Sequence, residues 1–109
     1  MGYKTISPEE LRKLVLQEMS KIDDTRLYYE LRAKKVRRML DLTTLKCCIA
    51  LHRLGLPITV GLVSYILGQH ESSVRTKLHV LGDKHLLVLK RESGIFEWTL
   101  SPLAQTLNV

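Results

Sequence analysis

The chain has 109 residues and a formal net charge of +6 at pH 7, and 45% of its residues are hydrophobic. This length fits one domain with room for an appended element, and the composition is that of a folded protein. No apolar run approaches the roughly 18 residues of a membrane helix, and the N-terminal sequence MGYKTISPEE is too polar for a secretory signal. We therefore expect a soluble cytoplasmic protein whose positive charge favours an anionic partner.

The first forty residues predict two helices. Ser7-Pro8-Glu9-Glu10 is typical of a helix start, because it combines a serine cap, a proline at the first helical position and a glutamate three residues after the serine. The apolar stripe that follows consists of Leu11, Leu14, Val15, Met19 and Ile22. Asp23-Asp24-Thr25 interrupts this stripe and can cap a second helix, which we expect from Arg26 to about Leu40.

The predicted second helix carries most of the net charge. Six basic residues against the single Glu30 give +5 over residues 26–40. Its apolar residues are spread around the helix, which leaves a narrow polar edge where Lys34, Arg37 and Arg38 lie close together. Two interpretations stay open for this edge: a solvated helix face, which is the usual meaning of a charge run, or contacts to nucleic-acid phosphates.

Residues 43–55, TTLKCCIALHRLG, predict a helix that is apolar nearly all round. Such a helix is buried on both sides, here against its own domain and against the N-terminal helices of the same or a second subunit. Cys47 and Cys48 match neither a zinc site nor a C-x-x-C motif. Two buried apolar side chains are the simpler interpretation; the alternative places Cys47 at a subunit contact, where it could form a cross-link.

The stretch Ile58–Leu81 predicts two short helices joined by a tight turn. Thr59 can cap the first helix, and Gly68 stands where a left-handed residue would end it. The second helix begins near residue 71 or 72, and its apolar face consists of Val74, Leu78 and Leu81. Its opposite face and flanks carry Ser72, Ser73, Arg75, Thr76 and His79. This polar surface suits a nucleic-acid groove, and a solvated helix of an ordinary helical domain is the alternative.

The remaining residues predict a β-hairpin and a last short helix. Residues 86–91 are strand-like, and Glu92-Ser93-Gly94 is a turn signal. Residues 95–100 alternate as a half-buried strand does, with one face made of Phe96, Trp98 and Leu100. Ser101-Pro102 then opens a helix that we expect to continue through Leu107.

This succession of elements resembles the winged helix-turn-helix family, most of all its MarR- and ArsR-type prokaryotic, archaeal or viral regulators. The matching positions are Leu67-Gly68, Val74, Leu78, Leu81, Leu86-Leu87-Val88, Gly94 and Trp98-Thr99-Leu100-Ser101. The resemblance implies a mostly α protein with a small β-hairpin, in which residues 1–42 form an N-terminal helical extension and residues 43–109 the winged domain. Gly82 departs from the family pattern, which usually has a longer residue there, and this leaves the end of the second helix open.

The resemblance also implies a function, namely sequence-specific binding of double-stranded DNA by a dimer that regulates transcription in the nucleoid. The second helix of the pair would lie in the major groove, where its DNA-facing residues would be Ser72, Ser73, Arg75, Thr76, Lys77 and His79. Arg75 is the best base reader, because its planar fork matches guanine O6 and N7. Lys90, Arg91 and Ser93 at the wing would contact the backbone or the minor groove.

Residues 8–55 hold more apolar surface than one small winged domain needs to cover, which predicts a homodimer through the N-terminal helices. Two other functions stay open. A protein-interaction module is favoured if the N-terminal helices cover the polar face of the second helix. A nonspecific chromatin or replication protein would bind DNA with little sequence preference.

The motifs of common enzymes are missing from the sequence. It has no Gly-rich phosphate loop, G-x-S-x-G, H-E-x-x-H or C-x-x-C, and no carboxylate pair placed for acid–base catalysis. The histidines do not fall at metal-ligand spacing; a weak site around His70, Glu71 and His79 is the lesser alternative, and we expect His52 to be a satisfied core histidine. The sequence therefore predicts a protein that is not an enzyme and needs no metal or cofactor.

Overall fold

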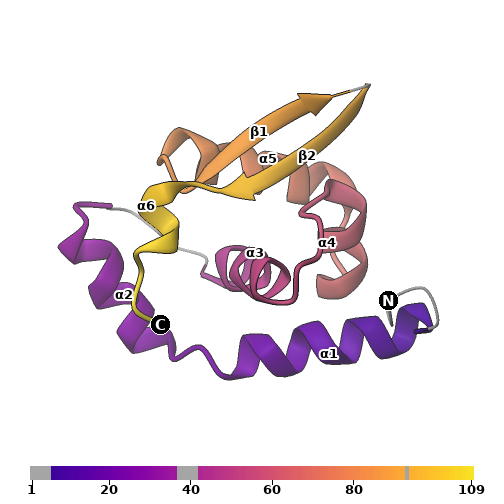
Figure 1. Ribbon diagram of the computed structural model, residues 1–109, viewed down its shortest axis with the longest axis horizontal. Helices are drawn as coiled ribbons and strands as arrows, with labels where there is room; N and C mark the ends of the chain where they lie inside the picture. The colour runs from indigo at the N-terminus through magenta and orange to yellow at the C-terminus, as the bar shows by residue number, and fades with distance from the viewer. Residues whose placement is uncertain (1–5, 37–41, 93) are drawn as a thin grey trace.

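The computed structural model describes residues 6–36, 42–92 and 94–109 (Figure 1). Over these ranges the chain is mostly helical and has one two-stranded antiparallel hairpin, which confirms the predicted fold class. The elements in order are α1 (Pro8–Ser20), α2 (Asp24–Ala33), α3 (Thr43–Arg53), α4 (Val60–Leu67), α5 (Glu71–Asp83), β1 (Leu87–Glu92), β2 (Ile95–Leu100) and α6 (Pro102–Gln105). None of the helices in these ranges is long and apolar enough to cross a membrane.

Side-chain caps set the helix starts, as the sequence predicts. Ser7, Asp23, Thr59 and Ser101 each accept a hydrogen bond from a backbone N–H of the first turn of their helix. Because the cap of α2 is Asp23, this helix begins two residues before the predicted Arg26. The last helix ends at Gln105, short of the predicted Leu107.

The second helix ends at Ala33 and does not continue to the predicted Leu40. Lys35 adopts a left-handed backbone with φ of 63°, and the Val36 N–H donates to the Leu31 carbonyl at 2.9 Å, which turns the chain back. A lysine in this conformation is uncommon and gives no signal in the sequence. The rest of the predicted helix, residues 37–41, lies outside the described residues.

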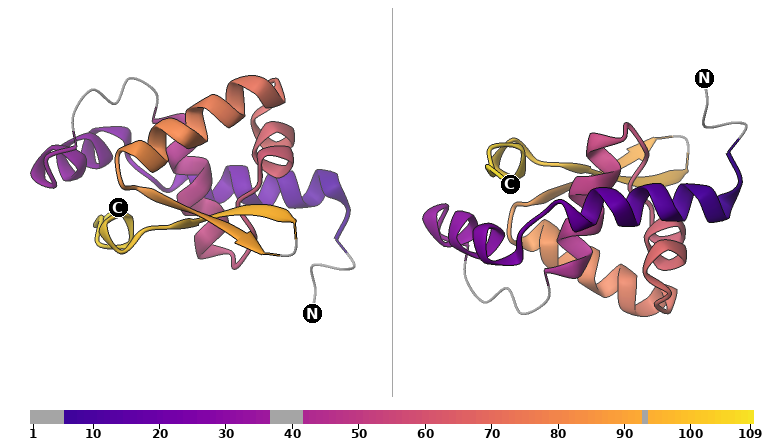
Figure 2. Two further views of the ribbon diagram at one scale, coloured as in Figure 1. Left: turned by 90° about the horizontal axis from the view of Figure 1, so that it is seen from above. Right: turned by 90° about the horizontal axis from the view of Figure 1, so that it is seen from below.

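Helix α3 lies at the centre of the fold and is buried on both sides, as predicted. α1 packs against one side, and α4, α5 and β2 pack against the others (Figures 1 and 2). Its buried residues are Thr44, Leu45, Cys47, Cys48, Ile49, Ala50 and Leu51. The expectation that His52 lies in the core is wrong, because this side chain is exposed. The buried residues of α3 stop at Leu51, so the apolar stripe ends before it reaches the imidazole.

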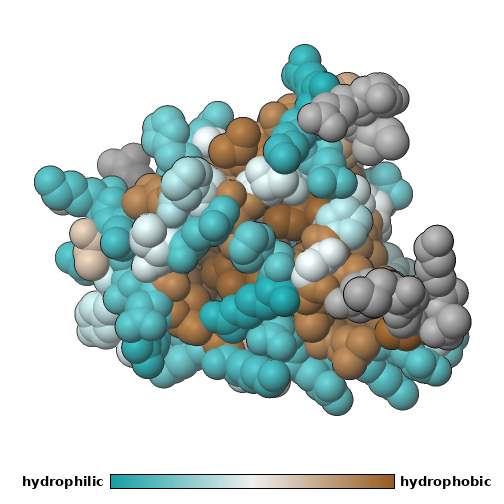
Figure 3. All heavy atoms as spheres, viewed as in Figure 1, coloured by the Kyte–Doolittle hydropathy of each residue, from teal (hydrophilic) through white to brown (hydrophobic). Residues whose placement is uncertain are grey.

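Helix α1 buries its apolar stripe within the same chain. Val15 and Met19 belong to the same hydrophobic cluster as the buried residues of α3, and Leu14 is 37% exposed. On the face seen in Figure 3, hydrophobic residues gather between α1 and the hairpin, and hydrophilic residues follow the outer side of α1. Much of the apolar surface from which the homodimer is predicted is therefore already covered in one chain.

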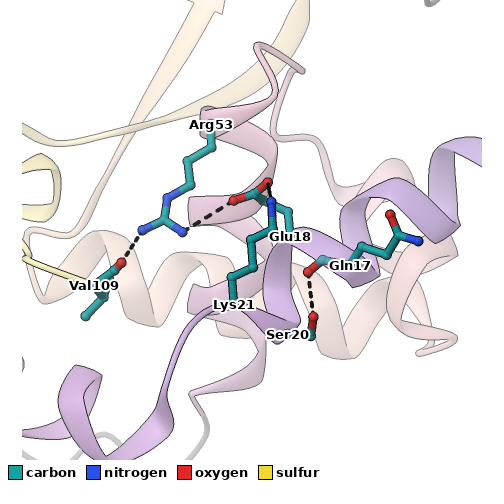
Figure 4. Close-up of polar contacts among 6 residues, drawn as sticks. All are labelled: Gln17, Glu18, Ser20, Lys21, Arg53 and Val109. Carbon is teal, nitrogen blue, oxygen red and sulfur yellow. Dashed lines mark hydrogen bonds and ion pairs between the residues drawn. The ribbon is translucent and has the colours of Figure 1, made fainter.

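Polar contacts also join α1, α3 and the C-terminus (Figure 4). Glu18 pairs with Lys21 at 3.3 Å and with Arg53 at 3.5 Å, and the Arg53 guanidinium also donates to the backbone carbonyl of Val109. Lys21 is largely exposed, so its pair with Glu18 contributes at most about 1 kcal/mol. The contacts of Arg53 therefore join α3 both to the end of α1 and to the last residue of the chain.

The hairpin pairs Leu87 with Leu100 at its open end and Glu92 with Ile95 at its turn, so β1 begins one residue later than predicted. Because strand side chains alternate, one face carries Leu87, Leu89, Arg91, Phe96, Trp98 and Leu100. Phe96 shares this face with two buried residues, as predicted, yet it is 59% exposed. The turn end of the hairpin extends past the helices in Figure 1, and Phe96 belongs to this end, where its strand partner is Arg91.

Candidate nucleic-acid interface

Helices α4 and α5 are joined by residues 68–70, and side chains from both helices hold this turn. Gly68 has a φ of 65° and ends α4, as predicted. The backbone carbonyl of Gln69 accepts a hydrogen bond from the Ser64 hydroxyl. The side-chain oxygen of Gln69 accepts a second one from the Lys77 amino group at 2.9 Å. Lys77 is half-buried and contacts this turn, whereas the other predicted DNA-facing residues are exposed.

The two faces of α5 are divided as the sequence predicts. Val74, Leu78 and Leu81 are buried. The exposed residues include the predicted readers Ser72, Ser73, Arg75, Thr76 and His79. Among the residues that the structure describes, there is no group of three His, Cys, Asp or Glu side chains that could hold a metal ion. His70 instead accepts a hydrogen bond from the Ser72 N–H at 3.3 Å and begins the helix.

Trp98 of β2 fixes the hairpin against α5. Its indole ring meets the imidazole of His79 edge to face, with 5.0 Å between the ring centroids. A Cβ added at Gly82 would lie 2.9 Å from Cζ3 of the same indole, so this position admits no side chain without movement. The backbone N–H of Trp98 also donates to the Ile58 carbonyl at 2.8 Å. Trp98 thus joins the hairpin to α5 and to the segment that leads into α4.

A groove with a volume of about 520 Å³ opens between α5, the hairpin and the start of α4. It is lined by Thr59, Val60, Gly61, Arg75, His79, Leu89, Arg91, Phe96 and Trp98. Among these residues two are arginines and none is acidic, so the groove attracts anions. Its floor is largely apolar, and the guanidinium carbon of Arg91 lies 5.5 Å from the centroid of the Phe96 ring.

The structure separates the predicted wing residues. Arg91 lines the groove together with Arg75. Lys90 lies on the opposite face of the hairpin, where its strand partner is Glu97. Neighbouring residues of a strand point to opposite faces. The separation of Lys90 from Arg91 therefore follows from the predicted strand over residues 86–91. The third predicted wing residue, Ser93, lies outside the described residues.

Among the predicted phosphate contacts of the basic segment, the structure describes Lys34, which does not line this groove. Lys34 is exposed at the end of α2. Figures 1 and 2 show α2 at the far end of the molecule from α4 and from the hairpin turn. Arg37 and Arg38 lie outside the described residues. Six of the nine lining residues are missing from the predicted site. Sequence patterns assign Thr59 to a helix cap and Phe96 and Trp98 to a core face, and the other three are Val60, Gly61 and Leu89.

Both cysteines are buried completely, which confirms the simpler of the two interpretations. Burial raises the pKa of Cys47 to about 12. The pKa of Cys48 is also well above its usual value, first because of burial and then because of the neighbouring Cys47. The alternative that places Cys47 at a subunit contact is wrong for this structure, since its side chain has no exposed surface.

Comparisons with known proteins do not assign this chain to a family. No protein-family model, curated protein or solved structure matches the chain. The case for a function therefore rests on the exposed face of α5, the groove beside it and the charge of both.

Proposed function

We propose that the chain binds double-stranded DNA in a sequence-specific manner and acts in transcriptional regulation. One observation carries this proposal. An exposed polar face of α5 and a groove without acidic residues adjoin each other, and Arg75 and His79 belong to both. The net charge of +6 supports an anionic partner.

The dimensions support the same partner. The major groove of B-DNA is about 12 Å wide and admits one α-helix. α5 projects hydroxyl, guanidinium and imidazole groups, and Trp98 holds its orientation relative to the hairpin. In the proposed complex α5 lies in the major groove, Arg75 pairs with a guanine edge, and Arg91 contacts the backbone of the strand that passes the hairpin. This arrangement agrees with the resemblance to winged helix-turn-helix proteins.

A homodimer would let two copies of α5 read an inverted repeat one helical turn apart. We keep it as part of the proposal, although the buried stripe of α1 is not available for it. Apolar side chains that are exposed on the N-terminal helices are Leu14, Tyr28 and Tyr29. The alternative of a protein-interaction module is favoured by a covered α5 face, and the five polar residues of that face are exposed instead.

Selection of binding sites from random duplexes tests the proposal, and the selected duplex is then compared with a scrambled one by fluorescence anisotropy. We expect a preferred sequence. Arg75→Ala should lose about 1–3 kcal/mol of binding free energy on the selected duplex and relax the preference at one base position. Arg26→Ala removes an equally charged, exposed side chain of α2 and is the matched control.

Two outcomes contradict the proposal. If the chain binds duplexes but the selection returns no preferred sequence, it is a nonspecific DNA-binding protein. If Arg75→Ala and Arg26→Ala lose the same affinity on both duplexes, binding depends on overall charge and α5 does not read bases.

A further inference from the structure

Phe96 is an aromatic side chain that the fold exposes at the groove. The ring is 59% exposed although it shares a strand face with the buried Trp98 and Leu100. The guanidinium carbon of Arg91 lies 5.5 Å from the centroid of this ring. An exposed ring beside a cation offers a stacking surface to a flat partner and an ionic contact to a negative one.

The groove has the size and the mixed chemistry of a small-ligand site. Its volume of about 520 Å³ falls within the range of roughly 300–1,000 Å³ that is common for such sites. Leu89, Phe96 and Trp98 supply apolar walls, while Arg75 and Arg91 supply positive charge. A flat aromatic group that carries a phosphate fits both the apolar walls and the positive charge.

A fully paired duplex offers phosphates to the arginines but no flat partner to the ring of Phe96. Its bases are stacked inside the helix, so the backbone that crosses the groove presents sugars and phosphates, which give the face of Phe96 no flat partner. An unpaired nucleotide presents both a free base and a phosphate.

We propose that this groove binds one unpaired nucleotide, with its base against Phe96 and its phosphate at Arg91, while Arg75 contacts the adjoining duplex. The inference rests on the proposed DNA binding and names a second feature of the DNA, a nucleotide without a partner next to the duplex that α5 reads. The same chemistry is available from a free mononucleotide, and the test separates the two sources.

The test uses the full chain and two duplexes that share the selected sequence, one fully paired and one with a single unpaired thymidine beside the site. Stacking of one base contributes roughly 1–3 kcal/mol, so we expect at least about fivefold tighter binding of the second duplex. Trp98 is the only tryptophan of the chain and lines the groove, so its fluorescence should change with the second duplex and much less with the first.

Three variants test whether the ring of Phe96 causes the tighter binding of the duplex with the unpaired thymidine. Phe96→Ala should remove the preference for the unpaired thymidine, so that the variant binds the two duplexes with equal affinity. Phe96→Tyr keeps a stacking face and should keep the preference. Tyr29→Ala is the matched control, since Tyr29 is 65% exposed but lies on α2, outside the groove.

Titration with thymidine monophosphate separates the sources. A change in Trp98 fluorescence at similar nucleotide concentrations with the free compound and with the unpaired duplex assigns the groove to free nucleotides. A change that needs the duplex assigns it to DNA.

Equal affinity of the wild-type chain for the two duplexes overturns the inference while the proposed function stands. An equal loss by Phe96→Ala on both duplexes also overturns it, because the ring then acts as a wedge between paired bases. Absence of binding to every duplex refutes the proposed function itself, and in that case only the mononucleotide titration bears on the groove.

Discussion

Gly82 of α5 and Trp98 of β2 lie in direct contact, and the absence of a side chain at residue 82 makes this contact possible. A Cβ there would approach Cζ3 of the indole to 2.9 Å and the neighbouring ring carbon to 3.3 Å. The indole is only 6% exposed and cannot turn away without disturbing the core. This glycine lies inside the helix, which continues to Asp83, and it sets how closely the hairpin approaches α5.

Gly82→Ala should lower the free energy of unfolding. Alanine favours a helix over glycine by about 1 kcal/mol, but forcing a methyl group into a packed site costs typically about 1–3 kcal/mol. Gly61→Ala is the matched control, because Gly61 lies in α4 with open space around the added Cβ. That variant should gain about 0.5–1 kcal/mol. Urea denaturation compares the two, and equal stabilisation of both would show that the indole moves aside freely.

Arg91→Ala and Lys90→Ala should differ in DNA binding although the residues are neighbours. Arg91 lines the groove and Lys90 lies on the other face of the hairpin. Loss of one phosphate contact makes the slope of log K against log salt shallower by about 0.9, and we expect this for Arg91→Ala. Lys90→Ala should change the slope much less. The reverse order in anisotropy titrations at several salt concentrations would place the outer face of the hairpin against the DNA.

The two thiols should resist alkylation in the folded protein at pH 8, because both are buried and their pKa values are raised. The same shift predicts a loss of stability in alkali. Below the usual thiol pKa of 9.0 both states are neutral, and between pH 9 and the folded pKa of about 12 for Cys47 only the unfolded chain ionises. The free energy of unfolding should therefore fall more steeply above pH 9 in the wild-type chain than in the variant Cys47→Ala/Cys48→Ala. Identical slopes would contradict the burial of the thiols.

Val15→Ala should lower the stability of the single chain, because Val15 is fully buried between α1 and the rest of the core. We expect a loss of about 1–3 kcal/mol, and a much smaller loss for the partly exposed Leu14→Ala. If Val15 packs only within its own chain, the difference between the melting temperatures of the wild-type and variant proteins should not depend on protein concentration. A difference that grows with concentration would show that a second copy stabilises this region.

Local signals in the sequence were sufficient for most of the fold. Ser7, Thr59 and Ser101 cap their helices as predicted, and Gly68 ends α4, because each depends on a few neighbouring residues. The end of α2 could not be predicted, since the left-handed Lys35 looks like any other lysine in a helical run. His52 was misplaced for a related reason: helical periodicity shows which side a residue is on and not where the covering elements stop.

The sequence predicts one part of the candidate site, the exposed face of α5, but not the groove. The exposed face of α5 follows from the positions of Val74 and Leu78. The groove does not follow from the sequence, because Thr59, Arg75 and Phe96 belong to three separate segments of the chain. The contacts of Trp98 bring these segments together. Alternation along the strand would have separated Lys90 from Arg91, whereas the exposure of Phe96 depends on how far the hairpin extends.

The most direct test of DNA binding through α5 and the groove is the salt dependence of affinity for the selected duplex. With about three phosphates neutralised by each bound chain, log K against log salt should have a slope of roughly −3 per chain, and therefore roughly −6 for a dimer. Arg75→Ala/Arg91→Ala should bind weakly with a shallower slope. A slope near zero, or no binding of the wild-type chain at low salt, would contradict the account.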